Sequence, residues 1–323
     1  MKINNIGYVC TTGKSLNNKV IVEKLYKLGL TTVRFNMSYR DKCMIGELVP
    51  AINEINLDKD IKIKTMVDLR GPEIRIDIKE PMLIEKNNIY VIGKDILIKE
   101  GNISVLDVGD IIIFGDGEIQ FKIIEKIDNY LKCISLNNGM LKKNKKITNE
   151  KLCKTISFLS DLDKEDIKTA LRLGIDYLCI SFVNSLEDVN EVKRIVGNHK
   201  IKIIAKIETK EGVENLEKII SKVDGIMIGR GDLGVRYPIY NLASVQKKIC
   251  NIVKKYNKKI IIGTGFLSSM KKEEIPTRAE VCDIYNAVLD GADEIMFSGE
   301  TATSISPENV LLTANRIIES IEM

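Results

Sequence analysis

Polar and charged residues follow each of eight short apolar runs in this 323-residue sequence. Lys206 and Glu208 close the run KIIAKIE, and Asp232 follows the next run, GIMIG. Two carboxylates at neighbouring strand ends suit Mg²⁺, which prefers oxygen ligands and keeps water or substrate oxygens in its remaining positions. Arg34, Arg75 and Lys206 supply the positive charge that phosphoryl or carboxylate substrates require. The full set of polar residues at the run ends is Thr11, Thr12, Arg34, Asn36, Ser38, Asp68, Arg70, Glu73, Arg75, Ser181, Lys206, Glu208, Arg230, Asp232, Thr264, Ser298 and Glu300.

These polar residues have to be placed together before they can act. Side chains alternate along a strand, so Lys206 and Glu208 point to the same side of an otherwise apolar segment. Taken alone, each residue would fit a surface salt bridge. Acids and bases clustered at eight strand ends favour a functional site over a set of unrelated surface contacts.

Two glycine motifs resemble nucleotide-binding loops but fit them poorly. GYVCTTGKS (7–15) has five residues between its first glycine and the Gly-Lys pair, whereas a P-loop has four, so different amides would converge on a phosphate. GRGDLG (229–234) matches the dinucleotide fingerprint but follows the sixth strand instead of opening an early βαβ unit. A flexible turn explains GRGDLG better than a dinucleotide-binding loop does. A third interpretation fits best, in which the glycines let backbone amides approach an anionic ligand while Asp232 holds a metal.

The composition is that of a soluble globular protein, with 44% hydrophobic and 29% charged residues. The net charge of +4 is mild and the lysines are dispersed, which disfavours nucleic-acid binding. No signal peptide precedes the first strand, and no apolar run reaches a membrane span. The seven cysteines form no C-x-x-C pair, which indicates reduced, buried thiols in a cytoplasmic protein. The single histidine, His199, is predicted to lie in a surface turn.

Hydrophobic periodicity predicts an alternation of strands and amphipathic helices. The predicted strands are 6–10, 32–36, 62–68, 176–182, 202–208, 225–229, 259–265 and 293–299. The predicted helices are 17–29, 41–55, 161–174, 185–197, 212–223, 241–257, 276–291 and 307–322. Eight β-α units with apolar strands predict a (β/α)₈ TIM barrel, whose active site lies at the C-terminal ends of the strands.

The third strand is separated from its helix by a stretch of different character. Residues 76–154 contain short β-rich runs between Gly, Asn and Asp, without a convincing helix. Because structureless connections of this length are rare in compact proteins, we expect a small all-β domain here. The predicted domains are therefore a barrel of residues 1–75 and 155–323 and an inserted domain of residues 76–154.

Several segments together resemble the pyruvate kinase family. VRFNMS (33–38) resembles the family's Arg-x-Asn-Phe-Ser segment, and VDLRGPEIR (67–75) resembles its Asp-x-x-Gly-Pro-Glu-Ile-Arg motif. IIAKIETKEGVENL, DGIMIGRGDLGV and PTRAEVCDIYNAVLDGADEIMFSGETA are close to further family motifs, so the likeness covers nearly the whole chain. GYVCTTGKS resembles the family's Val-Cys-Thr-x-Gly-Pro segment. The family's fold is a (β/α)₈ barrel with a β-rich lid inserted after the third strand, which agrees with the organisation predicted above.

The resemblance implies transfer of the phosphoryl group of phosphoenolpyruvate to ADP, giving pyruvate and ATP in the last step of glycolysis. Glu208 and Asp232 would bind Mg²⁺ (or Mn²⁺), and Lys206 would neutralise charge on the phosphoryl group in flight. The lid would close on the nucleotide phosphates and exclude water. The other implied roles are phosphate contacts by Arg34 and Arg75, carboxylate binding by Thr264 and the amides of Gly231 and Asp232, proton delivery near Thr264 and Ser298, and K⁺ binding by Asn36, Ser38, Asp68 and the carbonyl of Leu69.

The chain departs from the family pattern near the predicted site. IIGTGFLSSM stands where the family has Thr-Gln-Met-Leu-Glu-Ser-Met, so Thr264 is kept while Gly265 and Ser268 differ. Tyr39 stands where a histidine is usual near the nucleotide, and Arg236 replaces a usual glutamate.

The resemblance gives mixed indications about potassium and assembly. Glu73 is typical of family members that depend on K⁺, whereas Leu69 and Ile76 resemble members that do not. We expect this protein to depend on K⁺. The family continues into a C-terminal domain with effector sites and part of the tetramer contacts. This sequence ends with the eighth predicted helix, so we expect a short form without sugar-phosphate activation. A short form of this kind could still form a homo-oligomer through its barrel helices.

Two other functions fit the same residues. One is a Mg²⁺-dependent 2-oxoacid aldolase or decarboxylase on the same barrel, which the altered loop after the seventh strand favours. The other is a non-catalytic relative that acts as a regulator. The presence of both metal carboxylates and Lys206 counts against a non-catalytic protein, because a site released from function need not keep them.

Overall fold

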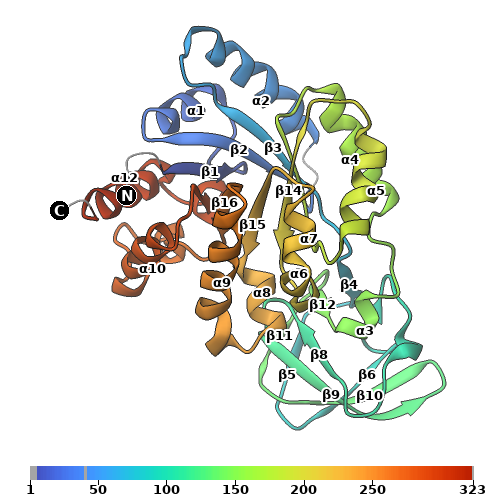
Figure 1. Ribbon diagram of the computed structural model, residues 1–323. Coiled ribbons are helices and arrows are strands. Elements are labelled where there is room, and N and C mark those ends of the chain that lie inside the picture. The colour runs from blue at the N-terminus through green and yellow to red at the C-terminus, as the bar shows by residue number, and fades with distance from the viewer. Residues whose placement is uncertain (1–5, 40–41, 322–323) are drawn as a thin grey trace. The chain divides into compact units, whose positions relative to one another are not determined.

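The chain forms two compact units in the computed structural model, which describes residues 6–39 and 42–321 (Figure 1). The first unit combines Met1–Arg70 with Asp161–Met323, and the second is Gly71–Ser160. The insertion boundaries expected from the sequence, 76 and 154, remain a prediction. No helix in the described part of the chain is long and apolar enough to cross a membrane.

The first unit contains a closed barrel of eight parallel strands. The strands are β1 (Gly7–Thr11), β2 (Leu30–Asn36), β3 (Lys64–Asp68), β13 (Tyr177–Ile180), β14 (Lys202–Ile207), β15 (Gly225–Gly229), β16 (Lys259–Gly263) and β17 (Glu294–Phe297). Their order around the barrel is β1-β17-β16-β15-β14-β13-β3-β2, so consecutive strands of the barrel are neighbours. The predicted TIM barrel, with an antiparallel β-domain inserted after the third strand, is confirmed.

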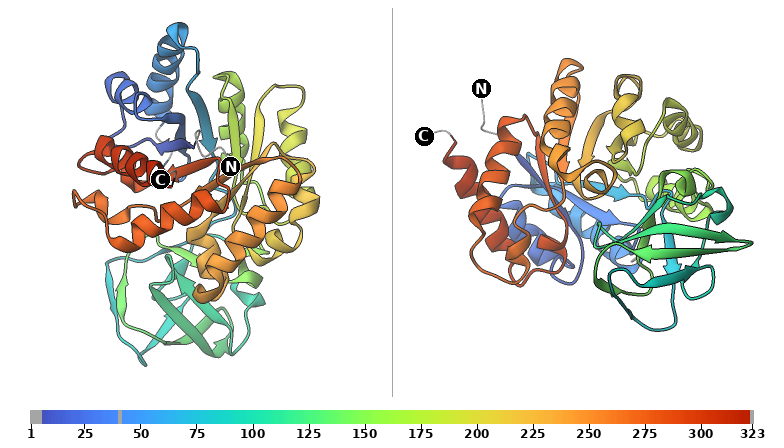
Figure 2. Two further views of the ribbon diagram at one scale, coloured as in Figure 1. Left: turned by 60° about the vertical axis from the view of Figure 1, so that its left-hand side comes forward. Right: turned by 90° about the horizontal axis from the view of Figure 1, so that it is seen from below.

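Helices cover the outside of the strands, as Figure 2 shows from two further sides. They are α1 (Lys19–Tyr26), α2 (Lys42–Ile55), α4 (Asp161–Arg172), α5 (Leu186–Val196), α6 (Lys210–Glu214), α7 (Leu216–Ile220), α8 (Arg230–Arg236), α9 (Leu242–Lys255), α10 (Arg278–Leu289), α11 (Gly299–Ala302) and α12 (Pro307–Glu319), with 3₁₀ turns η1 (Asn56–Asp58), η3 (Ile239–Asn241) and η4 (Ser268–Lys271). Capping boxes at Ser185 with Asp188 and at Thr277 with Glu280 start α5 and α10. The helix predicted at 212–223 is divided into two at Asn215.

The flexible turn that we ranked above a dinucleotide loop at 229–234 does not form, because residues 230–234 begin the short helix α8; the interpretation that we preferred, amides facing an anion beside Asp232, stays a prediction. Two glycines in seven residues lower helix propensity, so the sequence pattern does not indicate a helix here. Packing explains one of them: a Cβ atom at Gly231 would lie 3.1 Å from Cγ2 of Thr264. The first amides of a helix have no intrahelical acceptor, so this geometry still offers amides to an anion.

The barrel interior is filled by side chains from all around the sheet. They are Val9, Met66, Tyr177, Cys179, Ile204, Met227, Ile261 and Met296. Because the strands are buried on both faces, they appear in the sequence as continuous apolar runs. Among the cysteines, Cys10 and Cys179 are buried as expected, but Cys282 is exposed on α10, so the prediction of buried thiols is wrong there.

The second unit is built from antiparallel strands around its own core. The strands are β4 (Ile74–Asp77), β5 (Met82–Ile84), β6 (Ile89–Ile92), β7 (Leu97–Ile98), β8 (Ile111–Phe114), β9 (Ile119–Ile127), β10 (Tyr130–Ser135), β11 (Gly139–Leu141) and β12 (Lys146–Thr148). Seven form one sheet in the order β6-β10-β9-β8-β12-β4-β7, and β5 pairs with β11. Phe121 stacks on Tyr90 and meets Phe114 edge-on. A 3₁₀ turn, η2 (Ile103–Val105), and the one-turn helix α3 (Glu150–Cys153) also lie in this region, where the sequence predicted no helix.

Candidate functional site

The C-terminal ends of β2 and β3 bring together a buried arginine and a buried aspartate. Asp68 is 1% exposed, its Oδ2 accepts a hydrogen bond from Nε of Arg34 at 2.7 Å, and the same oxygen forms an ion pair with Nη2 at 2.7 Å. Arg34 also donates to Oγ1 of Thr11 at 2.8 Å. A planar guanidinium held in this way presents a fixed positive charge. Burial alone would raise the pKa of Asp68, but Lys206 and Arg34 together hold it below its ordinary value.

Lys206 lies between two carboxylates near the end of β14. Its Nζ is 3.3 Å from Asp68 Oδ1, 3.3 Å from Glu208 Oε1 and 3.0 Å from Oγ of Ser181. Burial alone would lower the pKa of Lys206, but the two carboxylates raise it above its ordinary value. Lys206 is therefore protonated and oriented by three partners, as a group that must stabilise developing negative charge should be.

Glu208 is the carboxylate with the most unusual environment. It is 2% exposed, and its Oε2 accepts the backbone N–H of Phe182 at 3.0 Å. Phe182 has a φ of +56°, which is rare for a bulky residue and directs its amide at this carboxylate. Burial raises the pKa of Glu208 to about 7; Lys206 opposes the rise, and the charge of Asp232 adds to it.

The pair Glu208 and Asp232 fits a divalent cation. Their mutual repulsion in a buried place is relieved when a positive ion lies between them, and Mg²⁺ is commonly held by one or two carboxylates plus substrate and water oxygens. In residues 6–39 and 42–321, no group of three or more histidine, cysteine and acidic side chains could hold a metal. A metal bound here would therefore need further oxygens from a substrate or from water.

The loop after β16 is held in an uncommon backbone conformation. Thr264, Gly265 and Leu267 all have positive φ angles, of 79°, 89° and 52°. Arg230 donates two hydrogen bonds to the carbonyl oxygen of Thr264, at 2.9 and 2.6 Å, and its guanidinium lies 3.8 Å from the ring centroid of Phe266. A strained threonine is thus fixed at the C-terminal end of the seventh barrel strand.

Arg230 is itself fixed from α10. Its Nη1 and Nη2 donate to the two carboxylate oxygens of Asp283 at 2.7 and 2.8 Å. The sequence predicts Arg230 only as one of the polar strand ends, without a role, and it does not predict Asp283 at the site. The only signal is the position of Arg230 directly before Gly231 and Asp232. The same side chain therefore joins the start of α8 to Thr264.

Ser298 follows β17 and directly precedes α11. Its backbone N–H donates to Oε2 of Glu300 at 2.9 Å, and Glu300 is 1% exposed. The structure thus places Thr264 and Ser298 at the ends of two paired strands, β16 and β17.

The four residues predicted to bind K⁺ come from the ends of β2 and β3. Asn36 and Asp68 are register partners, and Oδ1 of Asn36 accepts the amide of Ser38 at 3.1 Å. The carbonyl of Leu69 accepts the hydroxyl of Ser181 at 2.6 Å. Asp68 already serves Arg34 and Lys206, so a potassium ion here would add a third positive charge around one carboxylate.

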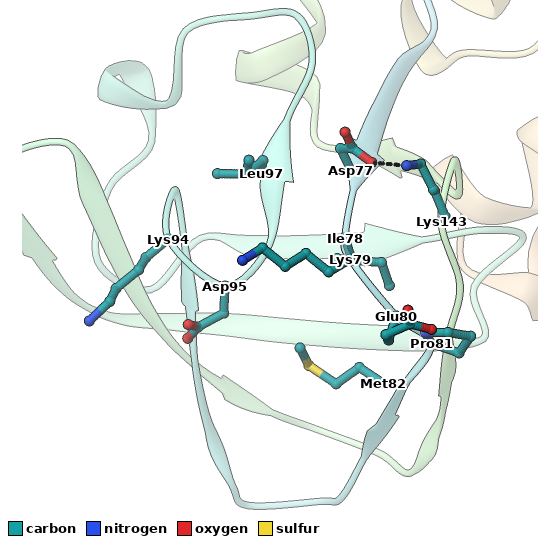
Figure 3. A pocket seen from close by; sticks show the side chains of 10 residues that line it. All are labelled: Asp77, Ile78, Lys79, Glu80, Pro81, Met82, Lys94, Asp95, Leu97 and Lys143. Carbon is teal, nitrogen blue, oxygen red and sulfur yellow. Dashed lines mark ion pairs between the residues drawn. The ribbon is translucent and has the colours of Figure 1, made fainter.

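Arg75 belongs to the second unit, on β4, so it is described with that unit. It pairs with Glu73 at 2.6 Å and donates to the carbonyl oxygen of Asn144 at 2.9 Å. The second unit also contains a cavity of about 660 Å³, shown in Figure 3. Three lysines and three acids line it together with apolar side chains, and Lys143 pairs with Asp77 at 3.1 Å. None of the lining residues is among the site residues predicted from the sequence.

Comparison with known proteins relates this geometry to a family. The model of the pyruvate kinase barrel domain matches residues 3–311. The chain belongs to the pyruvate kinase family. A pyruvate kinase of Thermotoga maritima is 33% identical over 328 residues, which cover 97% of this chain and 70% of the relative. One of Staphylococcus aureus is 32% identical and covers 97% and 56%, and one of Methanocaldococcus jannaschii is 35% identical and covers 95% and 67%.

A solved pyruvate kinase structure from Cryptosporidium parvum has the same fold. It superposes with a TM-score of 0.90 at 30% sequence identity and covers 99% of this chain and 70% of that chain. The chain therefore spans between about half and 70% of the length of these pyruvate kinases. Both of the family's structural parts seen here, the barrel and the inserted β-domain, lie within the aligned region.

Proposed function

We propose that this chain catalyses the pyruvate kinase reaction. The observation that carries the proposal is Lys206, whose half-buried ammonium group lies 3.3 Å from the carboxylates of both Asp68 and Glu208. In this reaction the P–O bond of phosphoenolpyruvate breaks and a new bond forms to a β-phosphate oxygen of ADP. The enolate left behind takes one proton at its methylene carbon to give pyruvate. Such a transfer is catalysed mainly by positioning and by stabilising charge on the phosphoryl oxygens.

The charged residues at the strand ends would have different roles in this reaction. Lys206 and Arg34 would face the phosphoryl oxygens, each held in place by Asp68. Glu208 and Asp232 would hold Mg²⁺ or Mn²⁺, which supplies Lewis-acid stabilisation of phosphoryl oxygens when bound.

The loop after β16 and the start of α8 would bind the other end of the substrate. The amides of Gly231 and Asp232 at the start of α8 and the hydroxyl of Thr264 suit a carboxylate. Thr264 and Ser298, on paired strands, would pass a proton to the enolate through water. We also propose K⁺ binding at Asn36, Ser38, Asp68 and Leu69.

A coupled assay of pyruvate formation tests this function. The purified chain is supplied with phosphoenolpyruvate, ADP and Mg²⁺, with and without K⁺, and compared with Lys206→Ala. We expect turnover in the wild type, a loss of about 10³-fold or more in the variant, and an increase with K⁺. Wild-type turnover no higher than that of the variant would contradict the proposal. Nucleotide-independent turnover of oxaloacetate would point to the aldolase or decarboxylase instead.

A further inference from the structure

The carboxylate of Glu300 joins the loop after β16 to the start of α11. Its Oε1 accepts the hydroxyl of Ser268 at 2.9 Å and pairs with Nζ of Lys271 at 2.9 Å. Its Oε2 accepts the amide of Ser298 at 2.9 Å. Glu300 is 1% exposed, so its carboxylate lies where water cannot solvate it. Lys271 is its ion-pair partner among the described residues.

The lysine has space to reach this carboxylate because residue 299 is a glycine. A Cβ atom at Gly299 would lie 2.6 Å from Cε and 3.0 Å from Nζ of Lys271. The lysine stem therefore packs over the first residue of α11 while its ammonium group meets the buried acid. The side chain of Lys271 is 40% exposed, so its removal opens no large cavity.

The second partner of Glu300 is one of the departures from the family pattern. Ser268 stands where the resemblance has a glutamate. A serine hydroxyl donates a hydrogen bond to Glu300, whereas a glutamate would bring a second negative charge beside it. In this chain a neutral donor and one lysine therefore surround the buried carboxylate.

We infer that Lys271 is a positioning residue for Ser298. With its charge balanced by Lys271, Glu300 stays in place and holds the Ser298 amide. That amide belongs to a residue with the unusual backbone angles φ −94° and ψ −100°. Without Lys271 the buried carboxylate loses its ion-pair partner and moves towards solvent. Ser298 then loses its anchor, and with it the alignment of its hydroxyl. The role of that hydroxyl in proton delivery rests on the proposed function.

Replacing the lysine tests the inference. We expect Lys271→Met to lower kcat about tenfold, because small misplacements of a reacting group are costly, while KM for phosphoenolpyruvate changes less than about twofold. Lys271→Arg restores the charge and should recover kcat to within about threefold of wild type. Lys272→Met is the matched control, because the neighbouring exposed lysine is not paired with Glu300, and it should behave as wild type. A Lys271→Met enzyme with wild-type kcat would overturn the inference.

A double variant separates positioning from a general structural effect. If Lys271 acts through Ser298, Lys271→Met combined with Ser298→Ala should be no slower than Ser298→Ala alone. If the decreases in kcat of the two single variants multiply in the double variant instead, the inference is wrong.

Amide hydrogen exchange gives a measure that does not need turnover. The Ser298 amide should exchange about tenfold faster or more in Lys271→Met than in wild type or Lys272→Met. Unchanged protection would overturn the inference in active and inactive protein alike. Lost protection in a chain that shows no pyruvate kinase activity would contradict the proposed function while supporting the contact made by Lys271.

Discussion

The two ends of the barrel each place a lysine beside a buried glutamate, and they differ in how the charges are connected. At the N-terminal end, Lys259 pairs with Glu294 at 3.0 Å across β16 and β17. Oε1 of Glu294 also accepts the hydroxyls of Thr31 and Thr32, at 2.7 and 3.2 Å. One cation and two hydroxyls thus meet Oε1 of one carboxylate, while its Oε2 is buried without a hydrogen-bond partner among the described residues.

At the C-terminal end, Arg34 and Lys206 are linked to each other through the carboxylate of Asp68, and Lys206 also meets Glu208. Arg34 pairs with Asp68, Lys206 lies 3.3 Å from both Asp68 and Glu208, and the charge of Asp232 adds to the rise in the pKa of Glu208. The same residue types therefore form one separate ion pair at one end and a connected cluster of ion pairs at the other. In barrels of this kind the C-terminal face carries catalysis and the N-terminal face carries stability.

The largest expected effect comes from breaking the C-terminal cluster. Lys206→Met should lower kcat in the phosphoenolpyruvate and ADP assay by about 10³-fold, because the charge that stabilises the phosphoryl group is removed. The steady-state rate of pyruvate formation measures it. The corresponding lysine at the other end, in Lys259→Met, provides the control. If both variants lost activity equally, the functional distinction between the two ends would be wrong.

The next effect concerns the clamp on the loop after β16. Arg230→Lys keeps the charge but loses the two-pronged contact with Asp283 and the double hydrogen bond to the carbonyl oxygen of Thr264. We expect kcat/KM for phosphoenolpyruvate to fall about 30-fold, since Thr264 relaxes from its strained conformation. Steady-state kinetics measure the change. A variant with wild-type kcat/KM would show that Thr264 keeps its place without Arg230.

At the N-terminal end of the barrel we expect a substitution to lower stability and to leave activity nearly unchanged. Lys259→Met leaves Glu294 buried with only hydroxyl partners, which should lower the free energy of unfolding by about 3 kcal/mol. Chemical denaturation measures the loss, and the activity of the folded variant should stay within about twofold of wild type. A large loss of activity without a loss of stability would place functional chemistry at this end as well.

The smallest expected effect is a pH-dependent contribution of Glu280 to the stability of the folded protein. It caps α10 and accepts hydrogen bonds from the amide and hydroxyl of Ser269, at 2.7 and 2.6 Å, so it ties the loop after β16 to that helix. Burial alone would raise the pKa of Glu280, but the hydrogen bonds from Ser269 and Thr277 lower it below its ordinary value. Its stabilisation is therefore present above the unfolded-state pKa and is lost as the pH falls through the folded-state pKa.

Glu280→Gln should accordingly lower stability by about 1 kcal/mol at pH 7 and by less as the pH falls below about 4.5. Thermal melts across this range measure the difference between the two proteins. A difference that grows towards low pH would contradict a lowered pKa for Glu280 in the folded state.

The arrangement of elements was largely predictable from the sequence. Each barrel strand lies within or overlaps a predicted run, because strands buried on both faces must be apolar throughout. The start of α8 was missed, because a helix that begins with glycines has a weak local signal and is stabilised by packing against Thr264. Nothing in the local sequence indicates that Thr264 or Phe182 has a positive φ, since neither is a glycine.

The sequence by itself determined the architecture, the likeness to pyruvate kinases and the identity of the polar residues that close the strands. It did so because the alternation of apolar and polar residues is a local property, and because parallel strands carry their C-terminal ends to one side. Only the tertiary structure decided which charges are shared. Asp68 lies 138 positions from Lys206 in the chain, and Arg230 lies 53 from Asp283. Such pairings depend on strand register and burial, and burial is what makes each of these charges need its partner.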